Sequence, residues 1–147
     1  MAHSGKTQAQ KAAAFEALHK APGVFVIPNP WDPGSARLLA GLGFKALTTT
    51  SAGDARSIGF PDYNAGRENV MAHIRAMAPM IDVPLAADLE DGFGPRPEDC
   101  AETIRQGAEA GLVGGSIEDF TGDRSDPIHS IAKAAEALNF QRTYVEI

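Results

Sequence analysis

Three carboxylates stand together directly after a short apolar run in the middle of the chain. Residues 83–87 are apolar and predict a buried strand, which is followed by Asp88, Glu90 and Asp91 and then by a glycine turn. Carboxylates crowded at the end of a strand repel one another and lose water, so a cation or a substrate must compensate them. Mg²⁺ prefers oxygen ligands and keeps several waters when it binds one or two carboxylates. The residue types therefore predict a magnesium site, with a solvated acidic turn as the alternative that the residues alone leave open.

Polar and acidic residues also follow two other strand-like segments. Residues 46–50 lead into Ser51 and, further along the loop, into Asp62, while residues 113–118 end at Glu118. Strands that deliver hydroxyls and acids at the same end are typical of a (β/α) barrel, whose chemistry lies at the C-terminal ends of its strands.

Helices and strands alternate along the chain, which predicts an α/β fold with a parallel sheet. We expect a long loop over residues 51–64. The expected helices cover residues 6–20, 35–42 (capped by Ser35), 67–80, 97–110 and 126–138; the expected strands cover residues 24–27, 46–50, 83–88 and 113–118, with the start of a fifth at 143–147.

Four βα units and a strand stub make about half of the eight units, or ~250 residues, of a complete barrel. An open parallel sheet is the structural alternative. A dinucleotide site is not expected, because a proline-rich turn over residues 28–34 replaces the glycine-rich phosphate loop after the first expected strand.

Composition limits the class of protein and its partners. The 147 residues predict one (partial) barrel domain, residues 1–147, and the net charge of −6 argues against nucleic acid or an anionic membrane as a partner. A single cysteine, Cys100, excludes an internal disulfide and fits a reducing compartment. No apolar run approaches the ~20 residues of a membrane-spanning helix, and the N-terminus does not read as a signal peptide. We therefore expect a cytoplasmic protein that acts on a small molecule.

Five motifs in order resemble the isocitrate lyase/phosphoenolpyruvate mutase family over about residues 11–138. They are Asn29-Pro-Trp-Asp-x-x-Ser-Ala-Arg-Leu, Thr-Thr-Ser51-Ala-Gly, Gly59-Phe-Pro-Asp, Asp88-Leu-Glu-Asp-Gly-Phe-Gly and Ile117-Glu-Asp. The resemblance implies the N-terminal half of a (β/α)₈ barrel of the phosphoenolpyruvate mutase type and a homo-oligomer. It also implies cleavage or formation of a C–C or P–C bond next to an α-keto acid or its enolate, with Mg²⁺ or alternatively Mn²⁺.

The resemblance also implies roles for individual residues. Asp88 resembles the acid that touches Mg²⁺ directly, and the acids that hold the water ligands of the metal correspond to Asp62, Glu90 and Glu118. The turn that holds the substrate carboxylate corresponds to Thr50, Ser51 and Ala52. Such a set fits the chemistry because an α-keto acid chelates Mg²⁺, and the metal with nearby N–H groups stabilises the enolate that forms. Glu118 is therefore expected among both the catalytic and the metal-binding residues.

Departures from the family pattern narrow the expected activity. Residues 118–125 contain no cysteine, lysine or histidine, although the isocitrate and methylisocitrate lyases carry a Lys-Lys-Cys-Gly-His loop there, and Phe120 stands where phosphonomutases have a lysine. Cys100 lies in an expected helix and is interpreted as a packing residue. The best-supported expectation is a Mg²⁺-dependent lyase or decarboxylase that acts on an oxaloacetate-like or methylisocitrate-like oxo acid. A phosphonomutase and a catalytically silent association module are the alternatives.

Two further polar residues are interpreted as structural. Asp54, between the carboxylate turn and Asp62, is expected to be solvated, and His73 is expected to be a partly exposed residue on a helix rather than a ligand.

Overall fold

Three short parallel strands form the sheet of the computed structural model, which describes residues 5–136. They are β1 (Leu47–Thr48), β2 (Leu85–Asp88) and β3 (Gly114–Ser116), in the order β1-β2-β3. Leu47 lies opposite Leu85 in the register, and Asp88 lies opposite Ser116. The parallel α/β arrangement expected from the sequence is therefore present, with three strands in the described residues where the sequence predicts four.

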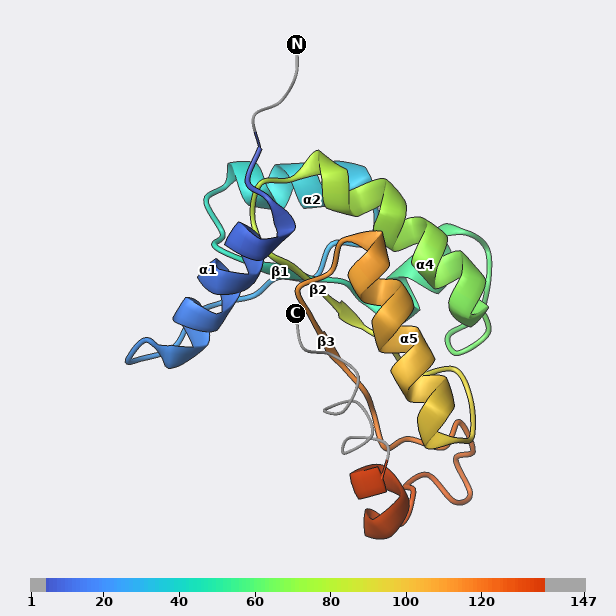
Figure 1. Cartoon of the computed structure of the whole chain (residues 1–147). Coiled ribbons are helices and arrows are strands. Elements are labelled where there is room, and N and C mark those ends of the chain that lie inside the picture. The colour runs from blue at the N-terminus through green and yellow to red at the C-terminus, as the bar shows by residue number, and fades with distance from the viewer. Residues whose placement is uncertain (1–4, 137–147) are drawn as a thin grey trace.

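Helices connect and cover these strands, and α4 and α5 lie side by side (Figure 1). Pro97 begins α5, and Gly111 ends it in the left-handed conformation at φ 108°, as proline and glycine commonly do at these places. In the described residues, none of the helices is long and apolar enough to cross a membrane. The elements are α1 (Gln8–Lys20), α2 (Pro33–Gly41), α3 (Ser51–Ser57), α4 (Gly66–Met77), the 3₁₀ turn η1 (Ala78–Met80), α5 (Pro97–Ala110) and a helical segment at residues 131–136.

One face of α4 supplies much of the hydrophobic core. Val70, Met71, Ile74 and Met77 recur at helical spacing and are all buried, as the sequence predicts. They belong to one apolar cluster with the strand residues Leu47 and Leu85 and with Leu89 and Leu112. This packing fixes α4 against the sheet, so residues at the start of α4 are held in place relative to the strand ends.

The first helix is attached to the rest of the molecule by polar contacts. The Gln8 side chain donates to the carbonyls of Ala108 and Leu112, each at 2.7 Å, and Lys11 Nζ donates to the carbonyl of Ile81 at 2.6 Å. Ile81 and Leu112 precede β2 and β3, so α1 lies at the end of the sheet opposite the strand ends that carry the acids.

The expected strand at residues 24–27 is not formed. Val24 is fully exposed and Val26 is 69% exposed, so this apolar run does not supply a buried strand. The chain approaches β1 only after this run, where the Thr48 N–H donates to the Pro28 carbonyl at 3.2 Å. Pro28 and Pro30 have no N–H to donate, which prevents regular ladder pairing.

Two helix starts differ from the expectation. α2 begins at Pro33 with Asp32 as its N-cap, because the Asp32 carboxylate accepts from the Ser35 N–H at 2.6 Å. Ser35 is thus the third helical residue and not the cap. The second difference is α3, which occupies the first part of the expected loop at residues 51–64. Thr50 caps it by accepting from the Gly53 N–H at 3.2 Å.

The last expected helix starts later than the sequence suggests. Residues 126–130 are not helical, and Phe120 forms an isolated antiparallel bridge with Ile128. The helical segment begins at residue 131, after Ser130, whose hydroxyl accepts from the Lys133 N–H at 3.3 Å. Its expected end at residue 138 and the expected strand at 143–147 lie outside the described residues.

Candidate active site

The sequence-predicted acids lie around the C-terminal ends of the three strands. Asp88 is the last residue of β2, Ser51 begins the helix that follows β1, and Glu118 follows β3. The strand ends meet because Leu89 N–H donates to the Ser116 carbonyl at 3.1 Å and Glu118 N–H donates to the Glu90 carbonyl at 2.7 Å. Residues from three segments of the sequence are thereby brought to one edge of the sheet.

Asp88 is held by hydrogen bonds on both carboxylate oxygens. Its Oδ2 accepts from the Ser51 hydroxyl at 2.7 Å and from the Ser51 N–H at 3.1 Å, and its Oδ1 accepts from the Glu90 N–H at 3.2 Å. The Asp88 N–H in turn donates to the Thr49 hydroxyl at 3.2 Å. These contacts hold the Asp88 carboxylate in one orientation at the end of β2.

Glu90 is the most perturbed acid of the cluster. It is 2% exposed, and its Oε1 has no hydrogen-bond partner in the described residues. Burial, followed by the nearby charges of Asp88, Asp91, Asp62 and Glu118, raises the pKa of Glu90 from the ordinary 4.5 to about 7. The same four neighbours show that the acids share one electrostatic environment, in which a cation would favour the ionised form of Glu90.

Asp62 and Glu118 stand on two loops near Glu90. Asp62 Oδ1 is buried and has no hydrogen-bond partner among the described residues. Glu118 is exposed and accepts a hydrogen bond from the Tyr63 hydroxyl. The Tyr63 ring also meets the Phe120 ring edge to face, with centroids 5.1 Å apart, so the loops that carry Asp62 and Glu118 touch.

The donor set fits a divalent metal in its chemistry, although a complete ligand group is not formed. Within residues 5–136, no three His, Cys, Asp or Glu side chains are placed so that they could enclose a metal ion by themselves. Asp62 and Glu90 nevertheless each have a buried carboxylate oxygen that no side chain or backbone group of residues 5–136 contacts by a hydrogen bond. Such oxygens beside Asp88 fit a hydrated Mg²⁺, which makes few direct protein contacts and binds further groups through water.

The expected carboxylate-binding turn has a more specific structure than the sequence suggests. Thr50 caps α3, and both donors of Ser51 are used by Asp88. Ala52 lies in the first turn of α3, where backbone N–H groups have no acceptor within the helix. The turn therefore orients Asp88, and the expected role of Thr50 and Ala52 toward a substrate stays a prediction.

A buried acid–histidine pair lies behind this turn, and it corrects two expectations. Asp54 is 2% exposed, not solvated, and the His73 Nδ1 lies 2.8 Å from its Oδ1, although this contact does not have hydrogen-bond geometry. The side chain of His73 is 10% exposed, and its Nε2 has no hydrogen-bond partner in the described part of the chain. Because Asp54 belongs to α3 and His73 to α4, the pair ties the helix that begins at Ser51 to the hydrophobic core. Sequence spacing could not reveal this pair, since the residues meet only through tertiary packing.

Cys100 of α5 is buried and is not part of the acid cluster. Cys100 is 3% exposed and burial raises the pKa of its thiol, so the interpretation as a packing residue fits its surroundings.

A cleft of about 860 Å³ opens beside Glu90 and is lined by Tyr63, Arg67 and Arg124 among others. The sequence did not single out Tyr63 or Arg67.

Comparison with known proteins agrees with the fold and the motifs. The chain is 53% identical to a protein of known structure from Burkholderia cenocepacia that is described as a lyase/mutase. The TM-score is 0.86, and the match covers 91% of this chain and 48% of that one. An uncharacterized protein of Mycobacterium tuberculosis is 36% identical over 82% of this chain and 46% of its own length. The 2-methylisocitrate lyase of Escherichia coli is 32% identical over 74% of this chain and 38% of its own length.

The chain thus spans about half the length of the relatives it matches. The sequence profile described as phosphoenolpyruvate phosphomutase matches residues 15–145. This match covers most of the chain and includes every motif quoted above. The motifs at the strand ends predicted this resemblance, and the chain belongs to the phosphoenolpyruvate phosphomutase family.

Proposed function

We propose that this chain carries the metal-binding half of a Mg²⁺-dependent lyase or decarboxylase that cleaves a C–C bond next to an α-keto acid. The substrate we propose is an oxaloacetate-like or methylisocitrate-like acid. The observation that carries the proposal is the buried Glu90 carboxylate, which lies among Asp88, Asp91, Asp62 and Glu118 with one oxygen unpartnered in the described residues. Such a cluster of acids is unfavourable without a compensating cation.

Each residue of the site has a part in this proposal. Asp88 would contact the ion directly, and waters around the ion would donate to Asp62, Glu90 and Glu118. Bound there, Mg²⁺ would supply a Lewis acid toward the oxygens of the oxo acid. Ser51 keeps the Asp88 carboxylate in one orientation through its hydroxyl and its N–H. The Thr50 hydroxyl and the Ala52 N–H would donate to the carboxylate of the substrate and fix its position.

The choice between C–C and P–C cleavage rests on the segment after Glu118. Phe120 packs against Tyr63 there, and residues 118–125 contain no lysine or histidine. Decarboxylation makes the smallest demand on such a segment, because CO₂ leaves without needing protonation and the resulting enolate accepts a proton from solvent. A phosphonomutase is the alternative within the family.

Turnover of oxaloacetate with Mg²⁺ tests the proposal. Because free Mg²⁺ also decarboxylates oxaloacetate slowly, the comparison is between the native chain and Asp88→Ala at the same metal concentration. Pyruvate release by the native chain above the Asp88→Ala rate supports the proposal, and methylisocitrate and phosphonopyruvate tested in parallel identify the bond that is cleaved. Equal rates for both chains with all three acids would contradict catalysis by this chain.

An association module is a second candidate, which exposed apolar side chains favour. Val24 is fully exposed, and Val26 and Ile131 are 69% and 88% exposed. Exposed apolar groups of this kind are typical of surfaces that pair with another protein surface. Sedimentation of the native chain beside Val24→Ser/Val26→Ser distinguishes the cases, since an association module loses its oligomer in the variant.

A further inference from the structure

The turn that carries Glu90 has an unfavourable backbone conformation. Glu90 and Phe93 have positive φ angles of 50° and 59°, and Gly92 between them has φ 87°. Non-glycine residues in the left-handed region cost about 1 kcal/mol or more each, and they persist only where surrounding contacts determine the backbone. Inside the turn, the Phe93 N–H donates to Asp91 Oδ1 at 2.9 Å, and contacts from outside the turn add to this support.

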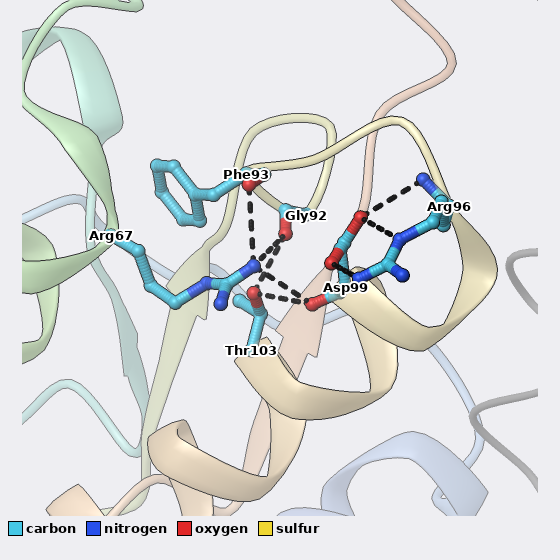
Figure 2. Close-up of polar contacts among 6 residues, drawn as sticks. All are labelled: Arg67, Gly92, Phe93, Arg96, Asp99 and Thr103. Carbon is cyan, nitrogen blue, oxygen red and sulfur yellow. Dashed lines mark hydrogen bonds and ion pairs between the residues drawn. The ribbon is translucent and has the colours of Figure 1, made fainter.

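Arg67, at the start of α4, makes those contacts (Figure 2). Its Nη2 lies 3.3 Å from the Gly92 carbonyl, 3.2 Å from the Phe93 carbonyl and 3.1 Å from the Asp99 carbonyl. One guanidinium nitrogen has two N–H groups, so it satisfies two of these three acceptors at a time. Hydrogen bonds from a charged donor are stronger than neutral ones, and this donor joins the turn after β2 to the first turn of α5.

Thr103 provides a second contact to the same carbonyl from α5. Its hydroxyl, on a side chain that is fully buried, lies 2.7 Å from the Gly92 carbonyl and 2.9 Å from the Asp99 carbonyl. Arg96 and Asp99 pair at 2.8 Å further along the turn, but Arg96 is 69% exposed there. Exposed pairs contribute little, so we expect Arg67 and Thr103 to stabilise the turn more than this pair does.

The fixed turn sets the position of two candidate metal-site acids. Gly92 closes the turn by donating its N–H to the Leu89 carbonyl at 3.0 Å, which places Glu90 inside it. The Glu90 carbonyl then accepts from the Glu118 N–H at 2.7 Å. A displacement of Gly92 and Phe93 would therefore move Glu90 and, through it, the backbone of Glu118.

We propose that Arg67 is a positioning residue for the metal site, which sets the metal affinity of the acid cluster by fixing the turn over residues 89–93. The inference rests on the proposed function, because it assumes that this cluster binds a divalent metal. Arg67 contacts neither the metal nor a substrate in this account. It acts on Glu90 through the carbonyls of Gly92 and Phe93.

Arg67→Met tests the role, because methionine keeps much of the side-chain length and removes every donor. Two measurements are made on the full chain: the Kd for Mg²⁺ by calorimetry, and hydrogen exchange of the Gly92 and Phe93 amides without metal. The control for charge is Arg105→Met, since Arg105 pairs with Glu102 and Glu109 on the surface of α5. The control for stability is Ile74→Val, which weakens the core and removes none of the hydrogen bonds of the turn.

The expected result is a Kd for Mg²⁺ about 10-fold higher in Arg67→Met, as is typical when a residue that supports metal ligands is lost. Hydrogen exchange of the Gly92 and Phe93 amides becomes faster in Arg67→Met. Both control variants keep the native Kd for Mg²⁺ and the native exchange rates of these two amides. Arg67→Lys recovers part of both losses, because an ammonium group can still donate to these carbonyls.

Native exchange rates at Gly92 and Phe93 in Arg67→Met would overturn the inference, and so would faster exchange with an unchanged Kd. If Arg67→Met does not fold, Arg67→Lys is measured in its place, and a Kd and exchange rates equal to the native values would overturn the inference. Absence of Mg²⁺ binding by the native chain would count against the proposed function, and the exchange rates alone would then decide whether Arg67 fixes the turn.

Discussion

The hydroxyl and the N–H of Ser51 both donate to one oxygen of Asp88, at 2.7 Å and 3.1 Å. Ser51 begins α3 after β1, and Asp88 ends β2. The contact therefore joins the ends of two neighbouring strands and leaves Asp88 in a single orientation at the centre of the acid cluster.

Ser51→Ala should weaken binding of Mg²⁺ while leaving the fold intact. The substitution removes the 2.7 Å hydrogen bond but keeps the backbone N–H that also donates to Asp88. Loss of an orienting hydrogen bond on a metal ligand typically costs about 10-fold or more in affinity. Calorimetry on Ser51→Ala and Ser51→Thr checks this, with Ser51→Thr expected to retain most of the affinity. Equal affinity of native and Ser51→Ala chains would refute the role of the hydroxyl.

Glu90 should make the metal-free chain less stable as the pH rises. Its pKa is about 7 in the folded chain and 4.5 ordinarily, so the folded state holds the proton more tightly than the unfolded state. The stabilisation from this group is complete below about pH 4.5 and is lost as the pH rises through 7, by up to about 3 kcal/mol.

Urea unfolding at pH 5 and at pH 8 measures this effect. Glu90→Gln should lose less stability between the two pH values than the native chain, because glutamine has no proton to release. A pH dependence that is identical in both chains would mean that Glu90 titrates normally.

Gly92→Ala should destabilise the chain far more than Gly122→Ala. Both glycines have positive φ angles, 87° and 81°. A Cβ at Gly92 would lie 2.4 Å from the Cys100 sulfur, whereas a Cβ at Gly122 would meet nothing within 4 Å. We expect a loss of about 1 kcal/mol at Gly122 from the backbone alone, and about 3 kcal/mol or more at Gly92 from backbone and overlap together. Similar midpoints in urea for the two variants would contradict this packing.

His73→Ala should destabilise the chain through the buried partner that it leaves behind. Asp54 is 2% exposed and its Oδ1 lies 2.8 Å from His73 Nδ1, and a buried polar group that loses its nearby polar partner costs about 1–3 kcal/mol. A double-mutant cycle with Asp54→Ala measures the coupling. Strictly additive effects of the two substitutions would show that the pair does not interact.

Sequence patterns predicted the elements whose signals are local. The apolar face of α4, the proline and glycine limits of α5 and the strand before Asp88 all match the structure, because periodicity and capping act within a few residues. The strand predicted at residues 24–27 is wrong, because apolar β-branched residues such as Val24 and Val26 also occur in exposed extended segments. The sequence does not predict α3, because Gly53 lowers its helix propensity and its cap, Thr50, falls at the end of an expected strand.

The candidate site was predictable only where a motif marks a residue. Asp62, Asp88, Glu90 and Glu118 were found from acids at strand ends and from the family resemblance, and their roles in binding stay predictions. Arg67, Tyr63 and His73 come from helices and loops whose contacts with the site depend on tertiary packing. Spacing along the chain carries no signal for such contacts.

Calorimetric titration of Mg²⁺ into the native chain and into Asp88→Ala, with and without oxalate as an enolate mimic, tests the central claim most directly. The account predicts that the native chain binds Mg²⁺ more tightly when oxalate is present, and that Asp88→Ala loses this binding while remaining folded. A folded native chain that binds no Mg²⁺ in either condition would contradict the metal site.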